Sequence, residues 1–169
     1  MDGRRRVSCP EMIATTMPEN GFNEPSFHGS FTRGIDDSRR VMLPAEWKPE
    51  DPKLVFRAIA WPLKTKNYLL VLTPDRWRVM LDKLKAKSLN DEQVAVFERV
   101  VGANSVSLTL DKVGRFCLPE ELANKVGLKK EAKLVGRLNK FEIWSPERFA
   151  ALAAADEEKA AEVASGLDL

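Results

Sequence analysis

Two stretches of the sequence place an aspartate four residues before an arginine, and Leu-Pro follows each arginine. Residues 35–44 read IDDSRRVMLP and residues 110–119 read LDKVGRFCLP, so both fit the pattern apolar-Asp-x-x-x-Arg-apolar-x-Leu-Pro. An arginine carried on a turn can enter the major groove and make two hydrogen bonds to a guanine. Arg40 and Arg115 are therefore the main candidates for contact with DNA. The alternative is a surface salt bridge to the aspartate of the same turn.

The other polar residues of the two turns have different expected roles. Asp36 and Asp111 are acidic and hence poor ligands for phosphate, so we expect them to accept hydrogen bonds from turn amides or to hold the arginine. Arg39 and Lys112 are expected to meet phosphates, which would add salt-dependent affinity without sequence information. For these two cations, plain solvated charge is the alternative.

The sequence gives little support for catalysis or for metal binding. It contains no GxGxxG, no Walker loop and no GxSxG pattern. The turn carboxylates each lie beside an arginine, which lowers their pKa and makes them poor general acids. His28 is the only histidine, too few for a site made of histidine ligands. We therefore expect no enzymatic activity, no cofactor and no metal.

The cysteines and the apolar runs indicate in which cellular compartment the protein is expected. Cys9 and Cys117 are far apart in sequence and suit a reducing compartment rather than a disulfide framework. Cys117 lies beside Leu118 in an expected strand, so we predict a small buried or half-buried side chain there. The longest aliphatic or aromatic run, residues 68–72, is far too short for a membrane helix. We expect a cytoplasmic protein.

Charge is unevenly distributed along the 169 residues. The whole chain has 27 basic and 25 acidic side chains, which gives a net charge of only +2. Residues 27–149 carry +7, whereas residues 1–26 carry −1 and residues 150–169 carry −4. The basic middle part suits a nucleic-acid partner, and the acidic ends conceal it in the sum.

The two arginine motifs belong to an internal repeat. Residues 35–44 align with residues 110–119 at an offset of 75, and residues 69–77 align with residues 141–149 at an offset of 72. Two matches in the same order imply a duplicated unit. The change in offset fits a short insertion or deletion in a loop, which costs little.

Strands are predicted on both sides of each turn. In residues 105–110 apolar and polar side chains alternate, which is typical of a strand with one solvated face. Residues 116–118 resume an extended segment after the turn of residues 111–114, so we expect a hairpin whose tip carries the arginine. A short helix over residues 120–126 follows, ended by Gly127.

Further helices are predicted from caps and periodicity. Thr73 and Ser145 each precede a proline and an acid, which is the signal of a helix start. Apolar residues recur at helical spacing over residues 75–101 with a break at residues 88–91, which predicts two helices that join the halves as an αα-hairpin. After Ser145, an alanine-rich and acidic helix should continue to about residue 164.

The doubled motif, together with WSPER at residues 144–148, resembles the MraZ family of bacterial transcription regulators, which are built from two AbrB-type modules. Residues 27–29 resemble the Phe-x-Gly with which that family usually begins. The resemblance covers about residues 27–150. It implies an α+β fold, a duplicated swapped-hairpin β-barrel with a linking αα-hairpin and a C-terminal helix.

The composition and the resemblance together predict the organisation of the chain. Prolines and the lack of apolar periodicity predict a disordered N-terminal arm over residues 1–26. We expect a first AbrB-like module over residues 27–82, a linking helical segment over residues 83–104, a second AbrB-like module over residues 105–150, and an acidic C-terminal helix or tail over residues 151–169.

The resemblance also implies partners and targets. Family members assemble into homo-oligomeric rings and bind double-stranded DNA at short G-rich direct repeats upstream of the division and cell-wall gene cluster, which usually contains their own gene. We expect a repressor at the nucleoid, although the residues do not distinguish it from an activator. The alternative is a structural or protein-interaction ring whose first turn no longer reads DNA.

Arg39 departs from the family because it occupies the position that Gly114 holds in the second motif. If this position needs a positive φ angle, Arg39 costs on the order of 1 kcal/mol in strain. Either the first turn has another shape or the extra charge compensates at a phosphate. AbrB-type modules often keep an arginine at the position of Arg33, which makes it a further candidate for DNA contact. Lys48 and Lys125 are candidates for the DNA backbone only.

Overall fold

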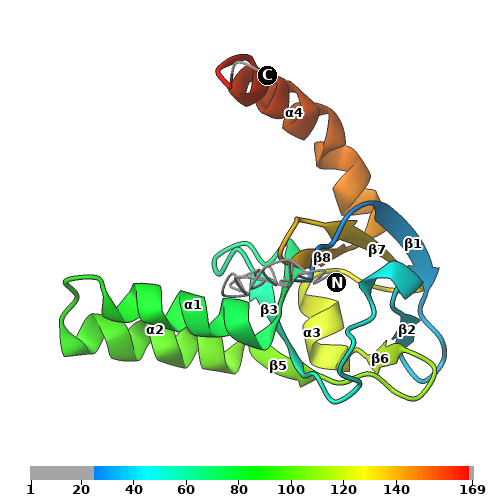
Figure 1. The fold of residues 1–169 in the computed structure, drawn as a ribbon, viewed down its shortest axis with the longest axis horizontal. Helices are drawn as coiled ribbons and strands as arrows, with labels where there is room; N and C mark the ends of the chain where they lie inside the picture. Colours follow the sequence, from blue (N-terminus) through cyan, green and yellow to red (C-terminus); the bar gives the residue numbers. More distant parts are fainter. Residues whose placement is uncertain (1–24, 168–169) are drawn as a thin grey trace, which may run out of the picture.

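The structure is a computed structural model that describes residues 25–167 (Figure 1). The predicted disordered arm over residues 1–26 therefore lies outside the described residues, apart from its last two. The strands are β1 (Ser30–Gly34), β2 (Arg40–Met42), β3 (Phe56–Trp61), β4 (Tyr68–Leu72), β5 (Ser105–Leu108), β6 (Arg115–Cys117), β7 (Glu131–Gly136) and β8 (Phe141–Trp144). The helices are the 3-10 helix η1 (Ala45–Trp47) and the α-helices α1 (Pro74–Lys85), α2 (Asp91–Ala103), α3 (Glu120–Lys125) and α4 (Pro146–Ser165).

The strands form two antiparallel sheets. Six of them make one sheet in the order β1-β7-β8-β4-β3-β5, and β2 and β6 make a separate two-stranded ribbon. α1, α2 and α4 project from the β structure, whereas α3 lies close to it, as Figure 1 shows. The prediction of an α+β fold is therefore confirmed.

Most strand pairing joins the first half of the chain to the second half. β1 pairs with β7, β2 with β6, β3 with β5 and β4 with β8. Only β3–β4 and β7–β8 pair within one half. Because the first strand of each half pairs with the third strand of the other, the two halves cannot separate without losing both sheets.

The predicted hairpin of residues 105–110 with residues 116–118 is wrong in one respect, because its strands do not pair with each other. β5 pairs with β3, and β6 pairs with β2. With the strands divided between the two sheets, Leu108 of β5 and Phe116 of β6 both enter the core, each with 2% of its surface exposed. Burial of two large apolar side chains compensates for the hairpin ladder that is not formed.

The main core lies between the six-stranded sheet and the ribbon, and both halves contribute to it. Four aromatic side chains at its centre, Phe27, Trp47, Phe56 and Phe141, have ring centroids 5.1 to 6.4 Å apart. These pairs all have edge-to-face or tilted geometries, which aromatic rings prefer. The core thus fixes the ribbon against the sheet.

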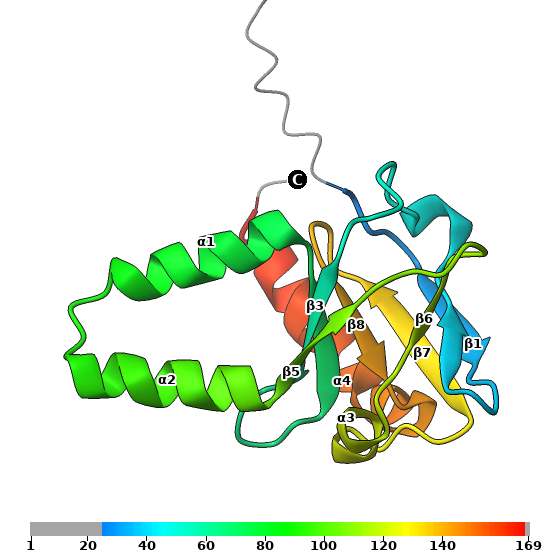
Figure 2. The same ribbon diagram turned by 90° about the horizontal axis from the view of Figure 1, so that it is seen from below.

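α1 and α2 form the predicted pair of helices between the halves, which is confirmed. The Thr73 side chain accepts a hydrogen bond from the Arg76 amide, and Asn90 and Gln93 form a reciprocal capping box at the start of α2. Figure 2 shows the two helices projecting together from one side of the β structure. A second apolar cluster under them joins Ile59, Leu70, Leu72 and Val101. Since α1 runs to Lys85, the expected linking segment of residues 83–104 begins inside that helix.

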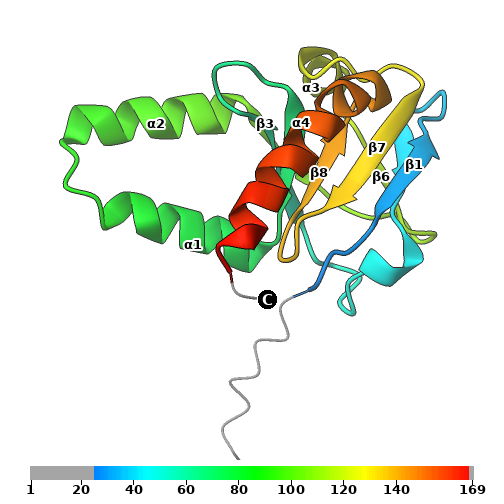
Figure 3. The ribbon, with the colours of Figure 1, turned by 90° about the horizontal axis from the view of Figure 1, so that it is seen from above.

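The remaining two helices also match their sequence signals. α3 ends before Gly127, which has a φ angle of +74°. α4 begins after Ser145, whose hydroxyl accepts a hydrogen bond from the Arg148 amide. Figure 3 shows α4 starting over the outer face of β7 and β8, and none of its described residues is buried. Among residues 25–167, no helix is both long and apolar enough to span a membrane.

Candidate nucleic-acid interface

Asp36 organises the turn between β1 and β2. Its Oδ1 accepts hydrogen bonds from the backbone amides of Ser38 (2.9 Å) and Arg40 (2.8 Å), and its Oδ2 accepts from the Arg40 Nε at 2.9 Å. The hydrogen bond from the Arg40 amide is the largest of several causes that lower the pKa of Asp36 below its ordinary value. The carboxylate stays ionised at neutral pH and holds both the turn and the arginine.

Asp111 makes the same set of bonds in the second half. Its Oδ1 accepts from the amides of Val113 (3.1 Å) and Arg115 (2.9 Å), and its Oδ2 accepts from the Arg115 Nε at 2.8 Å. The pKa of Asp111 is lowered as well, first by the Arg115 amide. The repeat in the sequence is therefore a repeat of hydrogen-bonded turns.

Both turn arginines are bound through only one side of the guanidinium group. Nε of Arg40 and Nε of Arg115 are taken by the aspartates, and no further hydrogen bond to either guanidinium is present within residues 25–167. The two side chains are 39% and 31% exposed. Each arginine is thus held at Nε, and its two terminal nitrogens have no hydrogen-bond partner among the described residues. Two terminal nitrogens of this kind are the donor pair that a guanine edge accepts.

The ribbon carries both arginines on one face. Its register pairs Arg40 with Cys117, Val41 with Phe116, and Met42 with Arg115. Since side chains alternate along a strand and the central pair is buried, the other two pairs face outward. The outer face therefore presents two arginines, a thioether and a thiol.

Cys117 and Met42 are the residues of this face that sequence reasoning missed. The prediction of a buried or half-buried Cys117 is wrong, because the residue is exposed and its Sγ lies 3.5 Å from the Ser38 carbonyl oxygen. Met42 is 37% exposed. Because Phe116 and Leu118 both point into the core, the residue between them must point outward, and this alternation was the available signal.

Arg39 has the same backbone conformation as the glycine of the second turn. Its φ angle is +56° and that of Gly114 is +88°, and both amides bond to the carbonyl of the turn aspartate, at 2.8 and 3.0 Å. The first turn therefore does not have another shape, and Arg39 bears a left-handed strain of about 1 kcal/mol. Its Nη1 donates to Glu120 Oε2, 2.7 Å away, at the first residue of α3.

The other predicted cations are placed differently. Lys112 is exposed at the second turn. Arg33 lies in β1, outside the ribbon, with its guanidinium over the Phe31 ring at 5.4 Å. Lys48 donates to the Val113 carbonyl at 3.2 Å, and Lys125 pairs with Glu121 at 2.9 Å, so both lysines are engaged with the protein itself.

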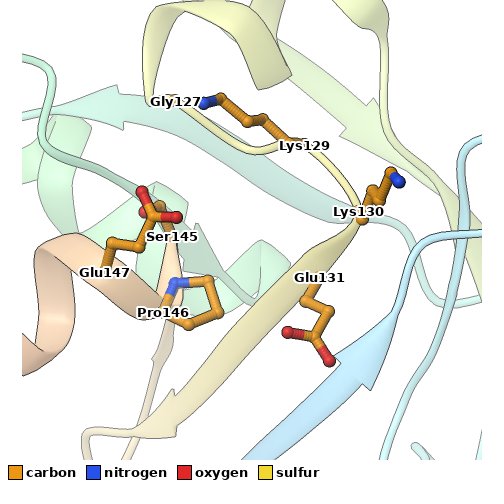
Figure 4. A pocket seen from close by; sticks show the side chains of 7 residues that line it. All are labelled: Gly127, Lys129, Lys130, Glu131, Ser145, Pro146 and Glu147. Atoms are coloured by element: carbon orange, nitrogen blue, oxygen red, sulfur yellow. The ribbon is translucent and has the colours of Figure 1, made fainter.

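A pocket of about 270 Å³ lies between the loop before β7 and the start of α4 (Figure 4). Its side chains combine Lys129 and Lys130 with Glu131 and Glu147, so the charges offset one another. The Ser145 hydroxyl at its edge is engaged as the helix cap. Among residues 25–167, no group of three or more His, Cys, Asp or Glu is arranged to hold a metal ion. The ribbon face remains the stronger candidate site.

Known proteins match most of the chain. The family model for the MraZ protein matches residues 102–168. The transcriptional regulator MraZ of Thermomicrobium roseum is 36% identical over 128 residues, which cover 75% of this chain and 87% of that protein. The chain belongs to the MraZ family.

Another MraZ relative supports this membership. The transcriptional regulator MraZ of Pseudomonas fluorescens strain Pf0-1 is 32% identical over 131 residues, which cover 77% of this chain and 87% of that protein. The chain is accordingly an MraZ-like transcriptional regulator and not an enzyme. Within the MraZ fold described above, the ribbon face with its two anchored arginines is the candidate surface for DNA.

Proposed function

We propose that the chain regulates transcription by inserting the β2–β6 ribbon into the major groove of DNA, where Arg40 and Arg115 read bases. One observation carries the proposal: an aspartate holds each guanidinium through Nε and leaves its terminal nitrogens without a hydrogen-bond partner among the described residues. A two-stranded ribbon fits the major groove, and an arginine fixed in this way loses little rotamer freedom when it binds guanine.

The neighbouring residues would supply position and turn shape. Arg39 and Lys112 flank the base-reading arginines and would contact phosphates, and Arg33 on β1 is a more distant candidate for the same role. Asp36, Asp111 and Gly114 would act on DNA only indirectly, by shaping the turns.

We also propose that the chain is a duplicated swapped-hairpin β-barrel of the AbrB type. The modules would be residues 27–82 and 105–150, with residues 83–104 as the link and residues 151–169 as an acidic tail. The exchange of first strands between the halves, β1 to β7 and β5 to β3, supports this description. Each half would therefore correspond to one chain of a two-chain AbrB module.

The regulator would act as a homo-oligomeric ring on double-stranded DNA at the nucleoid. A single ribbon makes few contacts, so several copies on direct repeats would raise affinity through effective concentration. We propose the repeats upstream of the division and cell-wall gene cluster, including its own gene, as the target, with repression as the outcome.

Replacing Arg40 or Arg115 with alanine tests this function. Both variants should bind the upstream repeats more weakly in an electrophoretic shift assay, while their size on gel filtration stays that of the parent. Arg78→Ala is a matched control, because Arg78 also pairs with an aspartate, Asp75, at 3.1 Å but lies on α1. Unchanged affinity of both ribbon variants would refute base reading by the ribbon.

A second candidate is a protein-interaction ring whose first turn no longer reads DNA. The bond from Arg39 to Glu120 favours it, because the acid offsets the additional cation of that turn. Retention on promoter DNA but not on unrelated DNA, together with weaker binding by Arg40→Ala, would exclude this candidate. Loss of binding in Arg115→Ala but not in Arg40→Ala would support a silent first turn.

A further inference from the structure

A cleft between α1 and the outer face of the six-stranded sheet combines an apolar floor with a basic rim. Its volume is about 220 Å³. Trp61, Leu70 and Leu72 form the floor, and Val79 and Met80 of α1 form a wall. Arg76, Lys83 and Lys140 complete the lining. The cleft lies away from the ribbon, so DNA reading does not account for it.

Two lysines of this rim lack a counter-charge. Within residues 25–167, neither Lys83 nor Lys140 forms an ion pair. The nearby Glu142 is already committed, because its two oxygens accept from Arg137 at 2.8 Å and from the Trp144 indole at 2.7 Å. Burial, followed by the charges of Arg137, Arg76 and Lys83, lowers the pKa of Lys140. An anionic group in the cleft would therefore gain from two lysines that form no ion pair with the described residues.

α4 carries acidic side chains that form no ion pair with the described residues. Glu158 and Glu162 lie one turn apart on the same face, with Ala155 preceding them on that face, and no described residue pairs with either acid. Like charges at this spacing destabilise an isolated helix by roughly 0.2–0.5 kcal/mol. Val163 nearby is 67% exposed. A cationic partner would turn this unfavourable pair into a favourable one.

The acidic part of α4 does not serve the cleft of its own chain. Figure 1 shows the C-terminal half of α4 standing clear of the α1–α2 pair. The start of the helix packs on the sheet, where Phe149 meets Trp144 with ring centroids 5.9 Å apart. The C-terminal half of this 20-residue helix spans roughly 15 Å. It is therefore available to another molecule, and charge complementarity selects a molecule with a basic cleft.

We propose that the Glu158–Glu162 face of α4 docks into the α1 cleft of a second copy of this chain, against Lys83 and Lys140. The two surfaces differ, so the contact is heterologous, and repeating it gives a closed ring or an open filament. Alanines beside the acids allow the helix to approach the apolar floor closely. This inference rests on the proposed assembly and assigns its interface.

Charge reversal on each side tests the contact in the full-length chain. Lys83→Glu/Lys140→Glu and Glu158→Lys/Glu162→Lys should each reduce the assembly to monomers in light scattering. Mixed in equal amounts, the two variants should assemble again as alternating copies, because the intact helix of one meets the intact cleft of the other and the reversed helix meets the reversed cleft.

Two further variants make the result interpretable. Lys85→Glu/Lys87→Glu changes the same charge on the same segment outside the cleft and should keep the parental assembly. Lys83→Glu alone, at an exposed position, guards against misfolding from the half-buried Lys140. Circular dichroism confirms folding in each case.

The outcomes separate the interface from the assembly and from DNA binding. An oligomeric parent whose reversal variants keep their size, or whose mixed variants stay monomeric, overturns this interface and leaves the proposed ring intact. A monomeric parent overturns both. The Arg40 and Arg115 variants test base reading independently of the interface and of the ring.

Discussion

Replacing each ribbon arginine with lysine separates base reading from simple charge. Lysine keeps the positive charge of Arg40 or Arg115 but lacks the planar pair of terminal donors and the Nε that the aspartate holds. A bidentate contact to guanine is worth about 1–3 kcal/mol of discrimination, which corresponds to roughly 5- to 150-fold in affinity. We expect a loss in this range for each substitution on the repeat sequence, and little loss on a scrambled sequence.

Fluorescence anisotropy over a series of salt concentrations measures both quantities. A DNA fragment with a single repeat is used, so that binding by several copies does not mask the loss at one turn. Because the charge is retained, the slope of log affinity against log salt should stay at the parental value. Arg39→Gln provides the contrast: removing a phosphate contact should weaken both DNAs equally and reduce the slope by about 0.9.

Equal losses of affinity on the repeat and on the scrambled DNA in Arg40→Lys and Arg115→Lys would refute base reading by these arginines. Binding of the repeat by both variants as tightly as by the parent would refute it as well. In either case the arginines would act as plain charges, and the anchoring aspartates would have no part in sequence recognition.

Four further outcomes are expected. Arg39→Gly should keep or raise the thermal midpoint, since glycine accepts the φ angle of +56° without the strain of about 1 kcal/mol, yet lower the salt slope. Because the pKa of Asp36 is lowered, its carboxylate should order the turn fully above pH 3.8 and lose this effect as the pH falls through the folded-state pKa. Amide NMR of the turn would detect the transition, and the Asp36→Asn variant should not show it. Alkylation of the exposed Cys117 in a Cys9→Ser background should slow when repeat DNA is bound, and equal rates would exclude the ribbon face. Phe141→Ala should lower the free energy of unfolding in urea by about 3–5 kcal/mol, because the ring contacts three other buried aromatic side chains.

Local sequence signals were sufficient for the helices and their ends. Thr73 and Ser145 were recognisable as caps because each stands before a proline and an acid, and the structure gives each of them the expected hydrogen bond. The strands flanking the turns were recognisable too, but not their partners. Residues such as Phe31 and Leu134 pair across more than half of the chain, and no local pattern encodes that choice.

In the candidate site, too, the contacts within one turn could be predicted from the sequence and the contacts between the two halves could not. The motif spacing was enough to place Asp36 and Arg40 in one turn, because the amide and Nε of Arg40 bond to a carboxylate only four residues earlier in the chain. The bond from Arg39 to Glu120 and the bond from Lys48 to Val113 each connect one half to the other, over 81 and 65 residues. Such contacts depend on how the ribbon closes over the core, so periodicity and motif spacing do not reveal them.

The difference between the two turns gives the chain a direction. Two identical turns related by symmetry would read the same in both orientations, which favours palindromic sites. Here one turn carries Arg39 bonded to Glu120, and the other carries Gly114 with Lys48 packed against it, so reversing the ribbon on DNA is not equivalent. Fusion of both halves in one polypeptide allows the turns to diverge, and successive copies on a promoter would all point the same way. A polarised reader of this kind requires sites that are repeated head to tail.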